Sequence, residues 1–446
     1  MALDRDELNK RRQARAEERR KREEAKRKMT VRLIVAAAVL LCCGIGIFRL
    51  ARSAGITPPL EDVLSMEVDG WGTEAVTEEP TEAPTEARTS WEQAPVTINL
   101  VAGGDLNVTD KVIWSGQLSG EYDYTKAFMD VAPILADADL SVLNFEGNVC
   151  GMPYGTDTVS APIEMIHALK NAGVDLLQMA NSCSIRNGLI GLTTTLDNMR
   201  AAGIEPLGAF SSSQEFQKSK GYTIVTVSDI KIAFVAFTKG VGSLGMPAGS
   251  EDCVNLLYTD YFTNYSEIDK DGIKAVLKAA QAEEPDLIVA MLHWGSEDND
   301  TIYETQKDIA TLMQKNGVDI IIGTHPHRVQ PVQYDEETGF LVAYSLGDFF
   351  GDGARGGTQY SILLDIEITK DYDTGITRVT NWNHTPIYTL AENECDGDRR
   401  VVRIENAMSA YELNFVDKVT ASCYENMTFA IERINDRILM KEETKK

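Results

Sequence analysis

The sequence predicts an α/β domain that is preceded by one transmembrane helix and a disordered stalk. Three observations lead to this prediction. A basic leader is followed by an uncharged apolar run, a stretch rich in Thr, Glu and Pro comes next, and beyond residue 95 strand-like apolar runs alternate with helix-like segments. One large α/β domain with these appendages accounts for the 446 residues.

The basic leader, residues 1–32, carries 13 Lys and Arg against 7 Asp and Glu, although the whole chain has a formal net charge of -25. Lys and Arg in excess before an apolar span place the leader in the cytoplasm. We interpret it as a cytoplasmic tail attracted to anionic lipid rather than to nucleic acid. The membrane is therefore an expected partner, and nucleic acid is not.

The transmembrane helix is expected at residues 33–51. Leu33 to Phe48 contains no charge, and Arg32 and Arg49 bracket it with stems that can reach the interface. The leader is long for a cleaved signal peptide, and neither cysteine of the run follows the small residue of a lipobox. We therefore expect a single-pass protein of the cell membrane, with a cytoplasmic N-terminus and an extracellular main domain.

The stalk is expected at residues 52–95. This stretch repeats Thr-Glu with Pro and has almost no apolar content to bury, which is typical of an extended, disordered linker.

The main domain is expected at residues 96–390. Its predicted strands are Ile98 to Ala102, Leu140 to Asn144, Leu176 to Met179, Thr223 to Val227, Ile232 to Phe237, Leu287 to Leu292, Ile320 to Ile322, Leu341 to Tyr344 and Ser361 to Ile368. Its predicted helices are Ile163 to Ala172, Gly191 to Ala202, Gly272 to Ala282 and Tyr303 to Asn316. The alternation indicates parallel βαβ units, in which ligands gather beyond the carboxyl ends of the strands.

Residues that can bind a metal ion follow several of these strands. Carboxylates and imidazoles together suit zinc, manganese or iron better than calcium, and two such ions can generate hydroxide and stabilise charge on a phosphoryl or acyl oxygen. The histidine pair could instead be structural, and the aspartate could cap a turn. The residues expected at this sheet edge are Asp105, Glu146, Asn181, His293, His325 and His327.

The motifs occur in a distinctive order: Gly-Gly-Asp, Asn-Phe-Glu-Gly, His-Trp-Gly, Gly-Thr-His-Pro-His-Arg-Val-Gln-Pro and Tyr-Ser-Leu-Gly-Asp-Phe. Across residues 97–390 the chain resembles the CapA-type capsule synthesis proteins associated with poly-γ-glutamate. The resemblance implies a metallophosphoesterase-like fold, a two-sheet αββα sandwich. It also implies a membrane-anchored extracellular protein of polymer metabolism with a divalent transition metal (Zn, Mn or Fe), one or two ions, in a hydrolytic centre.

The chain departs from this family at one turn. The family usually has Asn-Asn-His followed three residues later by Asp, whereas this chain has Asn181, Ser182 and Cys183, and then Arg186. The candidate catalytic residues are therefore His293, Cys183 and Arg186, and the usual histidine acid is missing. Arg186 would oppose metal binding but suit an anionic substrate. Asp348 replaces a usual Asn, and it could pair with Arg186 or bind metal.

Five cysteines lie beyond the predicted span, an odd number that leaves at least one unpaired. Cys150 and Cys183 both follow strand ends at the same edge, so we favour a disulfide between them over metal binding by Cys183. Cys395 and Cys423 could form a second pair, which their spacing does not decide.

Residues 391–446 are expected to form a helical appendage, with helices at Ile404 to Val416 and Tyr424 to Leu439.

Two classes of function follow. One is a metal-dependent hydrolase or transferase acting on an anionic envelope polymer, which the three histidines favour. The other is a non-catalytic scaffold that binds polymer within a membrane synthase complex, which the altered turn favours. If the protein is a hydrolase, the missing acid predicts weak activity on activated aryl phosphates and less on alkyl esters or peptides.

Overall fold

The computed structural model describes residues 94–395, 397–415 and 419–438. The expected transmembrane helix and nearly all of the expected stalk lie outside these residues. Among the described residues, no helix is both long and apolar enough to cross a membrane.

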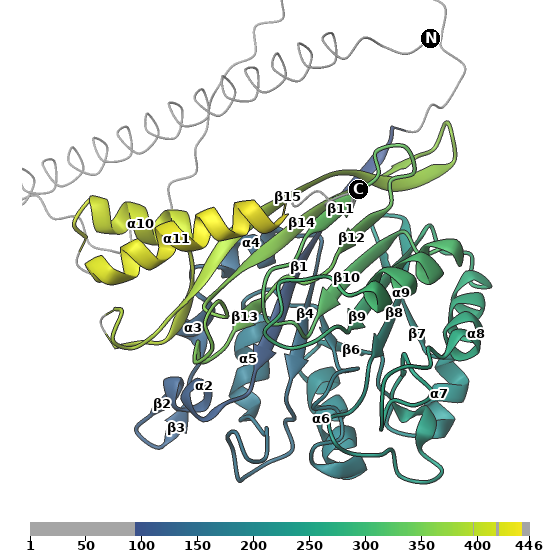
Figure 1. Ribbon diagram of the computed structural model, residues 1–446, viewed down its shortest axis with the longest axis horizontal. Coiled ribbons are helices and arrows are strands. Elements are labelled where there is room, and N and C mark those ends of the chain that lie inside the picture. Colours follow the sequence, from purple (N-terminus) through teal and green to yellow (C-terminus); the bar gives the residue numbers. More distant parts are fainter. Residues whose placement is uncertain (1–93, 396, 416–418, 439–446) are drawn as a thin grey trace, which may run out of the picture. The chain divides into compact units, whose positions relative to one another are not determined.

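The larger sheet has eight strands (Figure 1). Its parallel half is built from β1 (Val96–Asn107), β4 (Leu140–Glu146), β5 (Leu176–Gln178) and β6 (Glu205–Leu207), in that spatial order. On the other side of β1, antiparallel pairing adds β14 (Tyr360–Asp371), β15 (Ile376–Leu390) and β16 (Arg400–Arg403), in that spatial order. The short strand β13 (Asp348–Phe350) also pairs with β1, in parallel. A separate hairpin joins β2 (Gln117–Leu118) to β3 (Glu121–Tyr122).

The smaller sheet has six strands, and its four central ones are parallel. In spatial order the strands are β11 (Val332–Tyr334), β12 (Leu341–Ala343), β10 (Ile320–Thr324), β9 (Leu287–His293), β8 (Ile230–Thr238) and β7 (Tyr222–Val227).

Ten α-helices and one 3-10 helix, η1 (Glu251–Cys253), accompany the sheets in the described residues. The α-helices are α2 (Asp110–Ser115), α3 (Thr125–Phe128), α4 (Ala132–Asp137), α5 (Ile163–Asn171), α6 (Gly188–Ala201), α7 (Ser213–Ser219), α8 (Lys270–Gln281), α9 (Glu304–Lys315), α10 (Ile404–Glu412) and α11 (Ala421–Ile438).

The side chains of the smaller sheet show how the layers pack. Successive residues of a strand point to opposite faces, and in β8 Phe234 belongs to the core shared with the larger sheet whereas Val235 packs with α8 and α9. Helix α8 turns Ile273, Val276 and Leu277 toward the sheet, at the spacing of an amphipathic helix. The two sheets therefore pack face to face between helices, as an αββα sandwich (Figure 1).

All nine predicted strands and all four predicted helices of the main domain are present, with ends shifted by a few residues. The missed strands carry weak signals. β6 contains Pro206 among only three residues, and the first half of β15 is largely exposed and polar. The segment after residue 390 also adds β16 to the larger sheet before α10 and α11, where only helices were expected.

Candidate metal centre

Strand order and register bring the predicted residues together. Asp105 of β1 lies opposite Asn144 of β4 and opposite Asp348 of β13, and His293 at the end of β9 lies opposite Thr324 of β10. Glu146 ends β4, and the two remaining histidines directly follow β10. The carboxylates and imidazoles at this edge are all buried, at no more than 6% exposure: Asp105, Glu146, His293, His325, His327 and Asp348.

The first triad consists of Glu146, His293 and His325, whose ligand atoms all lie within 4.8 Å of one another. The two imidazole rings are 4.5 Å apart between centroids, and Nδ1 of His293 is 3.5 Å from Oε1 of Glu146. Nε2 of His293 and Nδ1 of His325 are buried and have no hydrogen-bond partner among the described residues. An unpartnered buried nitrogen is costly, so these two atoms fit a cation that would accept their lone pairs.

Burial controls the charge of the first triad. It lowers the pKa of His293 and of His325 well below the ordinary value, so both imidazoles are neutral at pH 7. It also raises the pKa of Glu146 to about 8. A divalent ion would relieve the cost of burying that carboxylate.

The second triad consists of Asp105, His327 and Asp348, again with ligand atoms within 4.8 Å of one another. Nδ1 of His327 lies 2.8 Å from Oδ1 of Asp348 and 3.4 Å from Oδ2 of Asp105. Burial alone would lower the pKa of His327, but the charges of Asp348, Glu146 and Asp105 outweigh it and raise that pKa to about 10. His327 is therefore an imidazolium at neutral pH, held by buried carboxylates.

Asn144 links the two triads. Its Nδ2 donates to Oδ1 of Asp105 at 2.6 Å and to Oε1 of Glu146 at 3.3 Å. Asn181 donates in turn to Oδ1 of Asn144 at 3.0 Å, while its own Oδ1 accepts the backbone N–H of Cys183. Both ends of the Asn181 amide are thus engaged within the protein. Asn181 supports Asn144, and its expected role as a direct ligand stays a prediction.

The backbone at the histidine pair is unusual. His325 has φ 92° and His327 has φ 58°, in the left-handed region that residues other than glycine rarely adopt. Such conformations cost on the order of 1–3 kcal/mol each and cluster at functional sites. The surrounding fold holds them here, because the backbone N–H of His325 donates to Oδ2 of Asp105 at 3.1 Å.

Gly104 explains the Gly-Gly-Asp motif. A Cβ at this position would lie 1.7 Å from the carbonyl oxygen of Gly347, so only glycine lets β1 approach the segment that leads to β13. A hydrogen bond holds the two segments together, because the backbone N–H of Asp105 donates to the same oxygen at 2.9 Å. Asp105 and Asp348 are thereby held side by side.

A cavity of about 380 Å³ opens onto the metal centre at His325. Glu297 lines it, and ligand atoms of Glu297, His325 and His327 form a third close group. Lys239 and Glu297 line this cavity and were not expected from the sequence. Lys239 directly follows β8, so the strand-end rule that found the histidines could have found it too. Glu297 lies in a loop, where residue type alone gives no signal.

Comparison with known proteins identifies the family of this chain. The family model described as bacterial capsule synthesis protein PGA_cap matches residues 99–352, more than half of the chain. The chain belongs to this family. It is 28% identical over 261 residues to the PGA biosynthesis protein CapA of Bacillus subtilis (strain 168), covering 57% of this chain, and 26% identical over 274 residues to the capsule biosynthesis protein CapA of Bacillus anthracis, covering 60%. In both cases it spans 63% of the relative's length.

Two solved structures show a distant likeness to this chain. The calcineurin-like phosphoesterase YfkN of Bacillus subtilis has a TM-score of 0.42 and 14% identity, with 77% of this chain and 98% of that one covered. A phosphatase of Mycoplasma pneumoniae has a TM-score of 0.43 and 14% identity, with 66% and 95% covered. These likenesses are distant, and the family assignment rests on the sequence match.

The turn after β5 contains Cys183 and Arg186, two of the candidate catalytic residues. Burial, with a further contribution from Glu146, raises the pKa of the Cys183 thiol to about 12, so the thiol is protonated at neutral pH. Arg186 is exposed, and its Nη2 donates to the carbonyl of Asp157 at 3.3 Å. Asp348 pairs with His327, and the structure shows no ion pair between Asp348 and Arg186 among the described residues.

The predicted disulfide between Cys150 and Cys183 is wrong, because both cysteines are free. The sulfur of Cys150 lies 3.7 Å from Oγ of Ser160, and that of Cys183 lies 3.8 Å from Oγ of Ser182. The two strand ends share a sheet edge, but the side chains that follow them have different neighbours. Cys395 and Cys423 are also free, and the Cys395 thiol donates to the carbonyl of Asp398.

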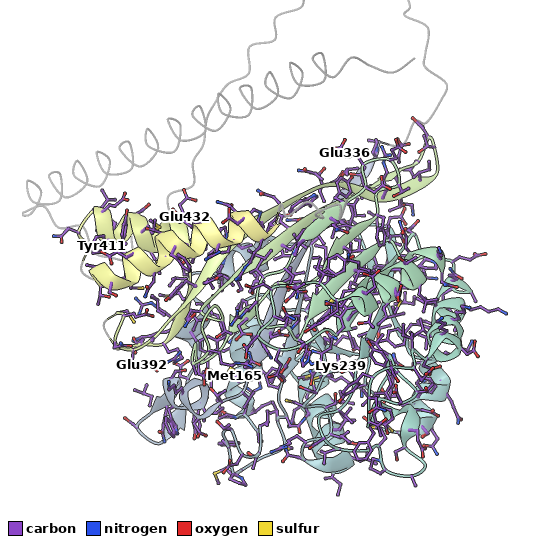
Figure 2. The ribbon with its side chains drawn as sticks, viewed as in Figure 1. Met165, Lys239, Glu336, Glu392, Tyr411 and Glu432 are labelled. Carbon is purple, nitrogen blue, oxygen red and sulfur yellow. The ribbon has the colours of Figure 1, made fainter. Side chains whose placement is uncertain are left out.

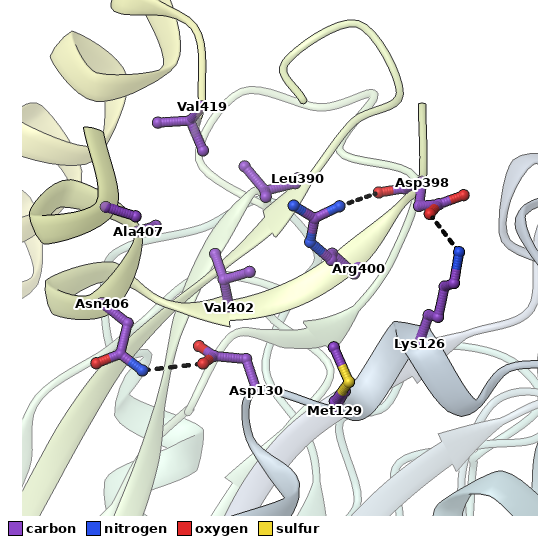
Figure 3. Close-up of a pocket in the computed structure, with 11 residues that line it drawn as sticks. Lys126, Met129, Asp130, Leu390, Asp398, Arg400, Val402, Asn406, Ala407 and Val419 are labelled. Carbon is purple, nitrogen blue, oxygen red and sulfur yellow. Dashed lines mark hydrogen bonds and ion pairs between the residues drawn. The ribbon is translucent and has the colours of Figure 1, made fainter. Parts of the chain in front are cut away.

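A second cavity, of about 390 Å³, lies between α3, β16 and α10 (Figure 3). Apolar side chains such as Val402 and Ala407 line it, and ion pairs and hydrogen bonds cross its rim. Lys126 pairs with Asp398 at 3.1 Å, and Asn406 donates to Asp130 at 2.9 Å. It contains none of the residues of the two triads.

Proposed function

We propose that this protein is a membrane-anchored extracellular member of its family that hydrolyses or transfers an anionic capsule or envelope polymer, of poly-γ-glutamate type, with a divalent transition metal. The observation that carries the proposal is the first triad. Two buried imidazole nitrogens without partners lie beside a buried carboxylate. No structural role of these side chains requires that arrangement, and zinc, manganese or iron would satisfy it.

The residues have separable roles in this proposal. A bound divalent ion would supply an activated water and polarise a phosphoryl or acyl oxygen. Glu146, His293 and His325 would hold that ion, and the second triad offers a place for another. Asn144 orients the carboxylates of both triads, as groups behind metal ligands commonly do. The cavity beside His325 gives the substrate access.

Proton delivery is the weak step of this centre. Cys183 occupies the position of the family's usual histidine, and a thiol with a pKa of about 12 releases its proton reluctantly. Positioned proton transfer contributes roughly 10²–10⁴ in rate. We therefore expect aryl phosphates with good leaving groups, such as p-nitrophenyl phosphate, to react faster than alkyl esters or amides.

The anchor supports an extracellular site. The uncharged run at residues 33–48 and the basic leader before it favour a single span with the main domain outside the cell. Expected partners are the membrane, the anionic polymer and a membrane synthase complex.

A non-catalytic scaffold is the second candidate, and the altered turn favours it. Ser182, Cys183 and Arg186 replace residue types that would bind metal or deliver a proton. In that case the protein would keep the fold and bind polymer for a synthase without cleaving it.

One experiment separates the two candidates. The full-length chain is purified in detergent, loaded with zinc or manganese, and assayed on p-nitrophenyl phosphate and on a γ-linked glutamate polymer. Cys183→His combined with Arg186→Asp should raise turnover on both, and Cys150→His serves as the matched control. If the wild type and the double variant are both fully loaded with metal and neither turns over either substrate, the hydrolase proposal fails and the scaffold proposal stands.

A further inference from the structure

The cavity over the metal centre contains one lysine, Lys239, labelled in Figure 2. Its backbone N–H donates to the carbonyl of His293 at 2.8 Å, which fixes it beside the first triad. Its Nζ donates to the carbonyl of Gly295 at 2.7 Å and lies 4.7 Å from the ring centroid of Tyr265. In addition to burial, its charge lowers the pKa of both His293 and His325, so its field reaches the metal centre.

Lys239 differs from the other cations near the centre. Nη1 of Arg355 is bound by Glu297 at 2.9 Å and by Asp298 at 3.2 Å, so its charge is already compensated. Arg186 is exposed and does not line the cavity. Among the described residues, no carboxylate lies within ion-pairing distance of Lys239. An ammonium has three donors, and the structure shows one of them used, on a carbonyl.

Tyr265, whose ring packs against the ammonium of Lys239, has an unfavourable backbone conformation. Tyr265 has φ 54°, a rare backbone state for a bulky residue, and its ring carries the ammonium on its face. A Cβ at Gly240 would lie 2.9 Å from the carbonyl of Tyr261 and 3.0 Å from Cε1 of Tyr265. Glycine at this position therefore lets the Tyr265 ring approach.

Burial lowers the pKa of Lys239, and the charge of Glu297, which lines the same cavity, opposes this only in part. A half-buried ammonium that no carboxylate contacts is unfavourable, and an incoming anion would compensate it. The chain has a net charge of -25, which disfavours association with a polyanion, so recognition of one is helped by a local positive group.

We propose that Lys239 is the residue that binds the anionic oxygen group of the substrate, a carboxylate or a phosphate, beside the metal centre. This inference rests on the proposed function, because it places that group in the cavity from which the substrate would reach the metal. Lys239 would select for a charged group next to the bond that reacts, and the face of Tyr265 would hold the ammonium in position.

The test measures binding by calorimetry to the metal-loaded, full-length chain in detergent. The probes are a short γ-linked glutamate oligomer, its methyl-esterified neutral form, and inorganic phosphate. The variants are Lys239→Gln, Lys239→Arg and, as a control of equal charge change, Lys278→Gln on the exposed face of α8. Losing a hydrogen bond to a charged group should weaken anion binding by about tenfold or more in Lys239→Gln.

The expected pattern is specific to charge. Lys239→Arg and Lys278→Gln should stay within a few-fold of the wild type, and the neutral oligomer should bind the wild type and Lys239→Gln equally. A loss confined to the oligomer identifies a carboxylate, and a loss confined to phosphate identifies a phosphate group. Unchanged affinity for both anions in Lys239→Gln overturns the inference.

Metal content, measured on the same samples, separates this inference from the proposed function. Wild-type protein that takes up no metal contradicts the proposed function, whatever Lys239 does. Wild-type protein that is fully loaded, with anion binding unaffected by Lys239→Gln, contradicts the role of Lys239 alone.

Discussion

The two triads contain the same kinds of side chain in opposite electrostatic states. In the first, His293 and His325 are neutral and two of their nitrogens have no partner. In the second, His327 is protonated and bonded to Asp348. The number of surrounding carboxylates makes the difference, because burial alone would leave all three imidazoles neutral. The first triad therefore offers unpartnered nitrogens to a cation. Each triad holds one proton that a cation would displace, on Glu146 in the first and on His327 in the second.

The largest expected effect is on the first triad. His293→Ala and His325→Ala each remove a nitrogen that has no other partner, and we expect zinc affinity to fall by more than about 100-fold, beyond what losing a supporting contact usually costs. Calorimetry on the metal-free protein measures this change. His167→Ala is the control, since His167 is exposed on α5. Equal affinities in all four proteins would refute the assignment of this triad.

Replacing Asn144, which links the triads, should reduce metal affinity less than replacing a ligand of either triad. Asn144→Ala removes donors to Asp105 and Glu146 but no ligand, and we expect a loss of about 10–100-fold in metal affinity. The same substitution at an exposed position of β15, Asn383→Ala, should leave the affinity unchanged. A loss below twofold for Asn144→Ala would mean that the carboxylates hold their places without it.

The pH dependence should separate the two triads. An ion at the first triad displaces a proton from Glu146, with a pKa raised to about 8, whereas an ion at the second displaces one from His327, with a pKa raised to about 10. Because each proton must leave, affinity should rise about tenfold per pH unit below the relevant pKa. Between pH 8 and 9 the affinity for the ion at the first triad should level off, while the affinity for the ion at the second triad should continue to rise.

Chelator-buffered zinc titrations at several pH values would check this difference. Asp348→Asn should weaken the continued rise, because it removes the charge that most raises the pKa of His327. Two ions with identical pH profiles would contradict the contrast between the triads.

The smallest expected effect concerns the cysteines. Because the five described cysteines are free, maleimide labelling of the unfolded protein should give the same count of reactive groups at these positions with and without prior reduction. Cys183→Ser should change that count by one in both conditions. A count that rises on reduction would reveal a disulfide that the structure lacks.

The sequence predicted much of this site, since strand ends are easy to locate. Asp105, Glu146 and the three histidines all follow apolar runs, and parallel strands bring such positions to one edge. Sequence could not show how the edge divides into two triads, because that depends on which strands are neighbours. The pairing of β13 with β1 places Asp348 beside Asp105, although 243 positions separate them in the chain.

The error at Cys183 has a related cause. A shared edge limits the distance between two strand ends, but it does not fix where the following side chains point. Cys150 lies against Ser160 and Cys183 against Ser182. Lys239 also follows a strand end, but a lysine is not a usual metal ligand, so its place in the cavity is clear only from the structure.

The direction of β1 separates the point where the chain enters the domain from the metal centre. The strand starts at Val96 and reaches the metal centre at Asp105, about 30 Å further along the extended chain. The chain therefore enters the domain at one end of the sheet, and the centre lies toward the other. A segment joined before Val96 would therefore enter the domain at the end of β1 away from Asp105, which leaves the approach to the centre to the loops that follow the strands.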